Sequence, residues 1–256
     1  MVKDITTGTR TLARGLRLLN KPGIRVYVII PLLINLILFG ALVWYGHSLF
    51  TSAVDWFMNL SLVVWLTNLM PSLQGFIEGF LWLFFGVFAA IVVFFAFTPV
   101  ANIVAAPFNA LMSEKIEALL TGIPAANDTS FVQMAIDTIS SQLRKLLYIA
   151  LWALGLFLVS LIPVINLIAP LLWFVFGSWL ISLEYLDYPM GNHELTFAEQ
   201  KRRLAERRGL SLGFGGAVMI MTSIPIVNFF VMPVAVAGAT VLWVEQFNSS
   251  TESAHA

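Results

Sequence analysis

One short stretch of this chain, Asn20-Lys21-Pro22-Gly23-Ile24-Arg25, combines residue types that can hold an oxyanion. Proline suits the first turn of a helix, so we expect a helix to begin here. The N–H groups at a helix start carry a partial positive charge, and Arg25 and Lys21 add full charges. Gly23 lets a ligand approach the backbone closely. The expected site therefore consists of the N–H groups of Gly23 and Ile24 with Arg25 and Lys21. The alternative interpretation is an arginine that reaches lipid headgroups.

A second candidate is a recurring pattern of proline and asparagine in apolar surroundings. Pro99, Pro163 and Pro225 are each followed three residues later by an asparagine, and then by a second proline. The asparagines are Asn102, Asn166 and Asn228, and Asn35 follows Pro31 in a looser version. Asparagine in lipid needs hydrogen-bond partners, and proline frees carbonyl groups that also need them. Either each asparagine satisfies its own broken turn, or the four converge and line a polar path.

Catalytic and metal-binding patterns are missing from the sequence. There is no cysteine, no HExxH, GxSxG or P-loop pattern, and the three histidines lie far apart along the chain. Glu78, Glu184 and Glu245 stand at the ends of apolar segments, whereas a proton relay normally places such residues inside them. We therefore predict no enzyme activity, no catalytic residue, no metal and no cofactor, and we favour a passive, channel-like route.

The elements that must position these residues are membrane helices. Hydrophobic residues make up 59% of the 256 residues and charged residues only 11%, against about 25% in a soluble domain. Four uncharged stretches exceed the roughly 18 residues that mark a membrane segment. The predicted fold is an all-α integral membrane protein with a single membrane domain, residues 1–256. Its predicted segments are an amphipathic N-terminal helix (1–25), a transmembrane helix (26–50), a periplasmic or interfacial segment (51–79), a second transmembrane helix (80–107), a cytoplasmic helical segment (108–145), a first hairpin (146–183), a cytoplasmic basic helix (184–209), a second hairpin (210–245) and a tail (246–256).

The two hairpins are predicted from arm length. Each arm has about 15–17 apolar residues and reaches about 23–26 Å, less than the roughly 30 Å of a hydrocarbon core. The turns Pro163–Asn166 and Pro225–Asn228 would then lie at membrane depth. Two re-entrant, hemi-penetrating hairpins beside two long transmembrane helices are the preferred arrangement, and six full crossings are the alternative.

Basic residues predict the orientation. Residues 1–25 hold six Lys and Arg, residues 108–145 three, residues 184–209 five, and residues 51–79 none. The positive-inside rule then places both termini in the cytoplasm. Within residues 6–21, Leu12, Leu16 and Leu19 share one helix face. Arg10, Arg14, Arg17 and Lys21 occupy another face, which indicates contact with anionic headgroups or, alternatively, a basic funnel for anions.

A capping box, Thr196 with Glu199, predicts the start of the basic helix Phe197–Arg208, which Gly209 is expected to close. Its flank contains Asp187, Tyr188, Asn192 and His193, which form either a functional cluster or, as we favour, a turn that docks this helix.

Several motifs in order resemble the CysZ family of bacterial sulfate permeases over almost the whole chain. They are Pro22–Arg25 with Pro31–Asn35, Ala105–Asn109 with Glu114, Glu117 and Leu120–Gly122, Asp187–His193, and Gly213–Gly215 leading to Ile224–Pro233 and Gly238–Thr240. The resemblance implies sulfate uptake across the bacterial inner membrane for cysteine biosynthesis, with sulfite as a further candidate substrate. It also implies a homo-oligomer. We expect no nucleic-acid partner.

The same resemblance implies where sulfate binds. The family's Gly-Leu-Arg sulfate motif falls on Gly23-Ile24-Arg25, and Val26 stands where relatives often carry a second arginine. Lys21 is the candidate that compensates for this difference. The competing functional hypothesis is a non-transporting membrane scaffold or assembly protein.

Overall fold

The computed structural model describes residues 2–123 and 131–248, and all regular secondary structure in these ranges is helical. The chain divides into two compact units, residues 29–108 and residues 1–28 with 109–256. Helix α5 (Thr98–Thr121) contributes to both units. Within these described ranges, four stretches are long and apolar enough to cross a membrane: Val26–Met58, Pro71–Val92, Ala169–Asn192 and Phe230–Asn248. The protein is therefore an all-α membrane protein, as predicted.

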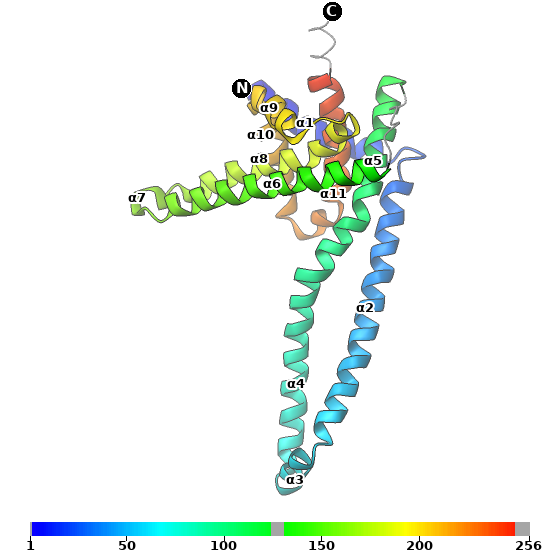
Figure 1. Ribbon diagram of the computed structural model, residues 1–256, viewed down its shortest axis with the longest axis vertical. Coiled ribbons are helices and arrows are strands. Elements are labelled where there is room, and N and C mark those ends of the chain that lie inside the picture. Colours follow the sequence, from blue (N-terminus) through cyan, green and yellow to red (C-terminus); the bar gives the residue numbers. More distant parts are fainter. Residues whose placement is uncertain (1, 124–130, 249–256) are drawn as a thin grey trace, which may run out of the picture. The chain divides into compact units, whose positions relative to one another are not determined.

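The unit of residues 29–108 is built on two long helices that run side by side (Figure 1). Its elements are most of α2 (Val26–Met58), then α3 (Ser61–Leu69), α4 (Pro71–Val92), the π-helix η1 (Val93–Phe97) and the start of α5. Phe50 of α2 stacks on Phe85 of α4 at 4.1 Å between ring centroids, and Trp82 meets Phe50 edge-on at 4.8 Å. Helix α2 continues eight residues beyond the predicted end at residue 50. Most of the large apolar side chains of α2 and α4 are exposed, as lipid-facing helices require.

The turn of π-helix at η1 has a local cause in the sequence. Pro99 has no backbone N–H, so one bond of the regular helical ladder cannot form just after η1. A π-bulge commonly accommodates such a disruption without ending the helix. The chain accordingly continues from α4 through η1 into α5 as one bent helical segment.

The other unit contains α1 (Val2–Leu19) and everything from Asn109 onward. Two of its segments are helical hairpins. Hairpin 1 consists of α6 (Phe131–Ser160), α7 (Pro163–Asn166) and α8 (Ala169–Asn192). Hairpin 2 consists of α10 (Arg208–Thr222), α11 (Pro225–Leu242) and the π-helix η2 (Trp243–Asn248), and α9 (Phe197–Glu206) connects the two hairpins.

Helix α1 packs against α10 and α11, and its buried face differs from the predicted leucine face. Its buried face runs through Gly8, Thr11, Leu12, Gly15 and Leu18, whereas Leu16 is 53% exposed. A Cβ atom on Gly15 would lie 2.8 Å from the Cα atom of Gly238 in α11. Small residues allow this close approach, and a pattern based on leucines alone did not reveal it.

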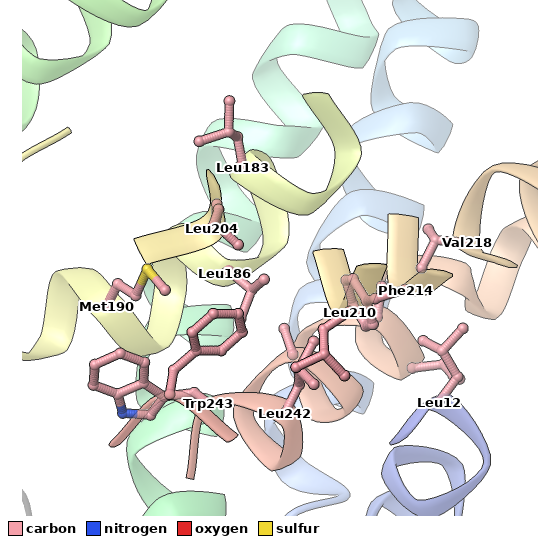
Figure 2. Packing of buried hydrophobic residues seen from close by; sticks show 14 of the residues in the cluster. Leu12, Leu183, Leu186, Met190, Leu204, Leu210, Phe214, Val218, Leu242 and Trp243 are labelled. Carbon is pink, nitrogen blue, oxygen red and sulfur yellow. The ribbon is translucent and has the colours of Figure 1, made fainter. Parts of the chain in front are cut away.

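The core of this unit joins α1, α8, α9, α10, α11 and η2 (Figure 2). It contains Leu12, Leu183, Leu186, Met190, Leu204, Leu210, Phe214, Val218, Leu242 and Trp243. Residues from both hairpins and from their connecting helix α9 therefore share one apolar cluster.

The connection between the hairpins is partly as predicted. The Thr196–Glu199 capping box is confirmed, because the Glu199 N–H approaches Thr196 Oγ1 (3.4 Å) and the Thr196 N–H donates to Glu199 Oε2 (2.9 Å). The predicted end of the helix is wrong. Helix α9 stops at Glu206, and Gly209 lies inside α10. Arg207 leaves the helical conformation there, with its Nη1 donating to the carbonyl oxygen of Gln246 at 2.9 Å.

Helix α8 is also longer than the arm predicted to end near residue 183. Its 24 residues run to Asn192 and span about 36 Å. The segment from Asp187 to Asn192 is therefore helix, and the turn predicted there begins only at His193. Gln200 Nε2 donates to Asp187 Oδ1 at 2.8 Å, so this end of α8 does dock α9.

Candidate anion-binding site

The predicted anion-binding residues lie in one tight connection between α1 and α2. Helix α1 ends at Leu19, and α2 begins at Val26. The Lys21 N–H donates to the Leu18 carbonyl at 2.9 Å, which closes the first bend. Gly23 has φ +88°, in the left-handed region that glycine adopts at little cost, and a Cβ there would meet nothing within 4 Å. The chain can therefore reverse at Gly23 and leave open space beside its backbone.

Arg25 is held in place by its own turn. Its Nε donates to the carbonyl oxygen of Asn20 at 2.9 Å. The guanidinium group has five N–H donors, so this bond leaves the two terminal NH₂ groups for a ligand. Lys21 and Arg25 are both exposed, so the loop presents two positive charges to its surroundings.

The role predicted for the Ile24 N–H needs correction. That group donates to the Lys21 carbonyl oxygen at 3.2 Å inside the turn, so it does not point outward. Within the described ranges, no acceptor receives the N–H groups of Gly23, Arg25 or Val26. The first residues of a helix have such unpaired donors by construction. The available donors are therefore these three N–H groups and the Arg25 guanidinium.

The predicted asparagines are placed in different surroundings. Asn35 is half-buried in α2, where its Nδ2 lies 3.5 Å from the Ala101 carbonyl and its buried Oδ1 has no partner among the described residues. Asn102 lies in α5, and its side chain is outside the described residues. Asn166 ends α7, Asn228 lies in the first turn of α11, and both side chains are exposed. Figure 1 shows α7 well apart from the α10–α11 connection, so one chain does not bring these two hairpin tips together.

The arginines on the basic face of α1 do not all have the same surroundings. Arg14 forms an ion pair with Glu245 of η2, within its own chain. Arg10 and Arg17 are exposed and remain available to headgroups or anions. Arg14 therefore contributes to the attachment of α1 to hairpin 2.

A polar network between α5 and the end of α8 was not predicted. Glu117 Oε1 lies 2.7 Å from His193 Nε2, and the Glu117 side chain is only 5% exposed. Asn192 Nδ2 donates to the Ala110 carbonyl at 3.1 Å, and Asn109 Nδ2 donates to the Tyr188 hydroxyl at 3.3 Å. Residues 109, 113 and 117 recur at helical spacing, a signal that they share a face, but the sequence alone did not name their partners.

Nearby contacts extend this network to both hairpins. Ser113 and Thr240 of α11 are buried and their hydroxyl oxygens lie 2.8 Å apart. The buried Lys145 of α6 pairs with Glu184 at 2.6 Å and with Asp187 at 3.4 Å. The His193 ring also packs at 5.2 Å from Trp243, which Arg203 covers at 5.4 Å. These contacts hold the helices together, although Glu117 Oε2 and Trp243 Nε1 are buried without a hydrogen-bond partner among the described residues.

Comparison with known proteins identifies the family. The family model described as sulfate transporter CysZ/etoposide-induced protein 2.4 matches residues 11–233. The chain belongs to this family. A sulfate transporter CysZ of Pseudomonas fluorescens (strain Pf0-1) is 39% identical over 252 residues, covering 96% of each chain. Those of Pseudomonas syringae pv. tomato and Vibrio parahaemolyticus are 42% and 38% identical and cover 94% of this chain, and 92% and 95% of their own lengths.

The resemblance to the CysZ family drawn from motifs is thereby confirmed. The matched region includes the turn of residues 20–25 and the asparagines at positions 35, 102, 166 and 228. The relatives are named as transporters and not as enzymes, which agrees with the lack of catalytic patterns in the sequence.

Proposed function

We propose that this protein takes up sulfate across the bacterial inner membrane and thereby supplies sulfur for cysteine biosynthesis. The observation that carries the proposal is the turn of residues 20–25. It exposes N–H donors and a braced arginine at the start of the long apolar helix α2. CysZ relatives that span the same length are named sulfate transporters, which supports the choice of anion.

The turn suits a dianion that is costly to dehydrate. Such a ligand needs oriented donors and a fixed positive charge without a deep apolar pocket. The Gly23 N–H and the terminal NH₂ groups of Arg25 can each donate to a sulfate oxygen, and Arg25 can bridge two oxygens. Lys21 adds a second charge in the same loop, which we propose compensates for Val26 in place of a second arginine.

The test measures sulfate binding by purified protein and sulfate flux into proteoliposomes. Hydrogen bonds to charged groups contribute roughly 1.5–3 kcal/mol each, so Arg25→Ala should weaken binding by about 10- to 150-fold. Arg17→Ala is the matched control, because Arg17 is exposed and has no ion-pair partner among the described residues. Equal, small losses of sulfate affinity in both variants would mean that Arg25 contacts lipid headgroups and does not bind sulfate. Failure of the parent protein to conduct sulfate would favour a scaffold role. Sulfite added as a competitor tests the second substrate.

We further propose that α2 and α4–η1–α5 cross the membrane, that hairpins 1 and 2 are re-entrant, and that both termini are cytoplasmic. The distribution of Lys and Arg supports the orientation. The exposed Arg10 and Arg17 of α1 would then face anionic headgroups on the cytoplasmic side.

The exposed asparagines at the hairpin tips support a proposal about assembly. An amide at membrane depth must bond to protein or to water, and Asn166 and Asn228 are both exposed in the single chain. We propose a homo-oligomer in which these amides border the polar path. We include Asn35 and Asn102 in this proposal because they belong to the same proline–asparagine pattern in the sequence. Asn166→Leu and Asn228→Leu should each reduce sulfate flux while the protein remains inserted. Unchanged flux in both would leave the asparagines as local turn residues.

A further inference from the structure

We propose that Ile24 is a positioning residue for the anion site, and that it acts through its side chain. The inference rests on the proposed sulfate site at the same turn. From residue 20 to residue 26, Ile24 is the single buried residue, with 0% of its surface exposed. Every other residue of this segment is exposed. The ligand-binding turn is therefore attached to the protein interior at one side chain.

Three helices form the surface against which the Ile24 side chain packs. Ile24 belongs to a buried apolar cluster with Leu18 of α1, Met112 and Ile116 of α5, and a strip of α11. The α11 members are Val236, Ala237 and Val241. Met112 and Ile116 are fully buried, and well-packed interiors tolerate little displacement. The position of Ile24 is therefore set by residues that the anion does not touch.

The backbone around Ile24 transmits this position to the donors. Its N–H donates to the Lys21 carbonyl at 3.2 Å, and its carbonyl accepts from the Tyr27 N–H at 3.1 Å. Gly23 and Arg25, the proposed ligands, are its two covalent neighbours. Gly23 has φ +88° and open space where a side chain would stand, so no side chain of its own anchors Gly23, and the other bonds of the turn join residues of α1, the turn and α2. Shortening the Ile24 side chain should let Gly23 and Arg25 sample several orientations while leaving both residues present.

The experiment measures the sulfate affinity of purified full-length variants by scintillation proximity, below the melting temperature of each variant. It compares Ile24→Ala with Ile24→Leu, and Met112→Ala with Leu210→Ala. Ile24→Ala should weaken binding by about 10- to 100-fold, because misplacement by about 1 Å can cost that much. Ile24→Leu keeps the apolar volume and should stay close to the parent. Met112→Ala, which removes volume from the α5 side, should also weaken binding. If Ile24→Ala folds poorly, Ile24→Val gives a smaller change in the same direction.

The control is Leu210→Ala, which opens a cavity at a fully buried leucine in the other core cluster. It should lower the melting temperature and leave the affinity unchanged. An equal loss of affinity in Leu210→Ala would indicate general loosening and overturn the proposal. Parental affinity in both Ile24→Ala and Met112→Ala would overturn it as well. Arg25→Ala is measured alongside. If Arg25→Ala binds sulfate normally, the proposed sulfate site itself fails, independently of Ile24.

Discussion

Hairpins 1 and 2 share a turn motif but differ in burial. Each turns at a Pro-x-x-Asn sequence, at Pro163–Asn166 and Pro225–Asn228, between apolar arms. In hairpin 2, 67% of an 18-residue apolar window within Phe230–Asn248 is buried in its own chain. In hairpin 1, only 28% of the corresponding window within Ala169–Asn192 is buried, and the described part of α6 exposes Leu147, Leu151 and Leu158. Hairpin 2 therefore lies mostly in the core of the unit, whereas hairpin 1 contributes residues of α8 to that core and leaves a broad apolar surface.

The difference follows from the distribution of glycine. Helix α10 has four glycines, all buried, and two of them allow close backbone contacts: Gly213 with Ile5 of α1 and Gly215 with Ser178 of α8. Helix α6 contains a single glycine, Gly155, and a Cβ there would meet nothing within 4 Å. Membrane helices associate through small residues because lipid supplies no hydrophobic driving force between them. Buried glycines at close contacts, more than apolar content, thus distinguish α10 of the packed hairpin from α6 of the exposed one.

The largest expected effect tests this explanation with one substitution in each hairpin. A Cβ on Gly215 would overlap the Ser178 carbonyl and lie 2.5 Å from Ser182 Oγ. Gly215→Ala should therefore destabilise the protein by about 3 kcal/mol or more, as overpacking against a rigid backbone does. Gly155→Ala should be neutral or stabilise by up to about 1 kcal/mol, since alanine favours helix. Thermal unfolding in detergent measures both. Equal stability of the two variants would contradict a role for Gly215 in packing.

The second prediction concerns how hairpin 1 is attached. Its α8 end is tied to α5 by polar contacts, including the Glu117–His193 pair at 2.7 Å. His193→Ala leaves a carboxylate that is 5% exposed without this partner, which should cost about 1–3 kcal/mol. In a double-mutant cycle with Glu117→Gln, the two losses should not add, because both remove one interaction. Glu114→Gln, on the same helix without an ion pair among the described residues, is the control. Additive losses would mean that the two side chains act independently.

The sequence predicted the apolar elements well because length and composition are local properties. The apolar helices, the capping box at Thr196 and the turn at residues 20–25 all follow from nearby residues. The buried face of α1 and the end of α9 were not predicted, since they depend on Gly238 and Gln246, which are distant in sequence. The Glu117–His193 pair was missed for the same reason, because its partners are 76 positions apart in the sequence. The inward orientation of Ile24 needed the positions of α5 and α11.

The third prediction asks whether the hairpins differ in depth as they do in burial. The chain has no cysteine, so single cysteines report one position each. Val164→Cys and Ile224→Cys replace exposed residues near the two tips, and Asn68→Cys replaces an exposed residue of α3. With re-entrant hairpins, a bulky impermeant reagent on the periplasmic side should label position 68 well and both tips poorly. Strong labelling at position 164 but not at position 224 would mean that hairpin 1 crosses the membrane fully, as the 24 residues of α8 permit.

The smallest expected effect lies in α9, the helix between the hairpins. Glu199 is exposed, and the hydrogen bonds that it accepts from the Thr196 hydroxyl and backbone N–H hold its pKa below the ordinary 4.5. A carboxyl group with a lowered pKa in the folded state stabilises the fold above its unfolded pKa. This contribution is lost as the pH falls through the lowered value. The melting temperature of the parent should therefore slightly exceed that of Glu199→Gln at pH 7, and the gap should close as the pH falls below 4.5 and through the lowered pKa. Glu206→Gln in the last turn of α9 is the control, because its exposed pair with Arg202 at 3.8 Å contributes little. A gap between parent and Glu199→Gln that stays constant with pH would show that the charge of Glu199 does not stabilise the cap.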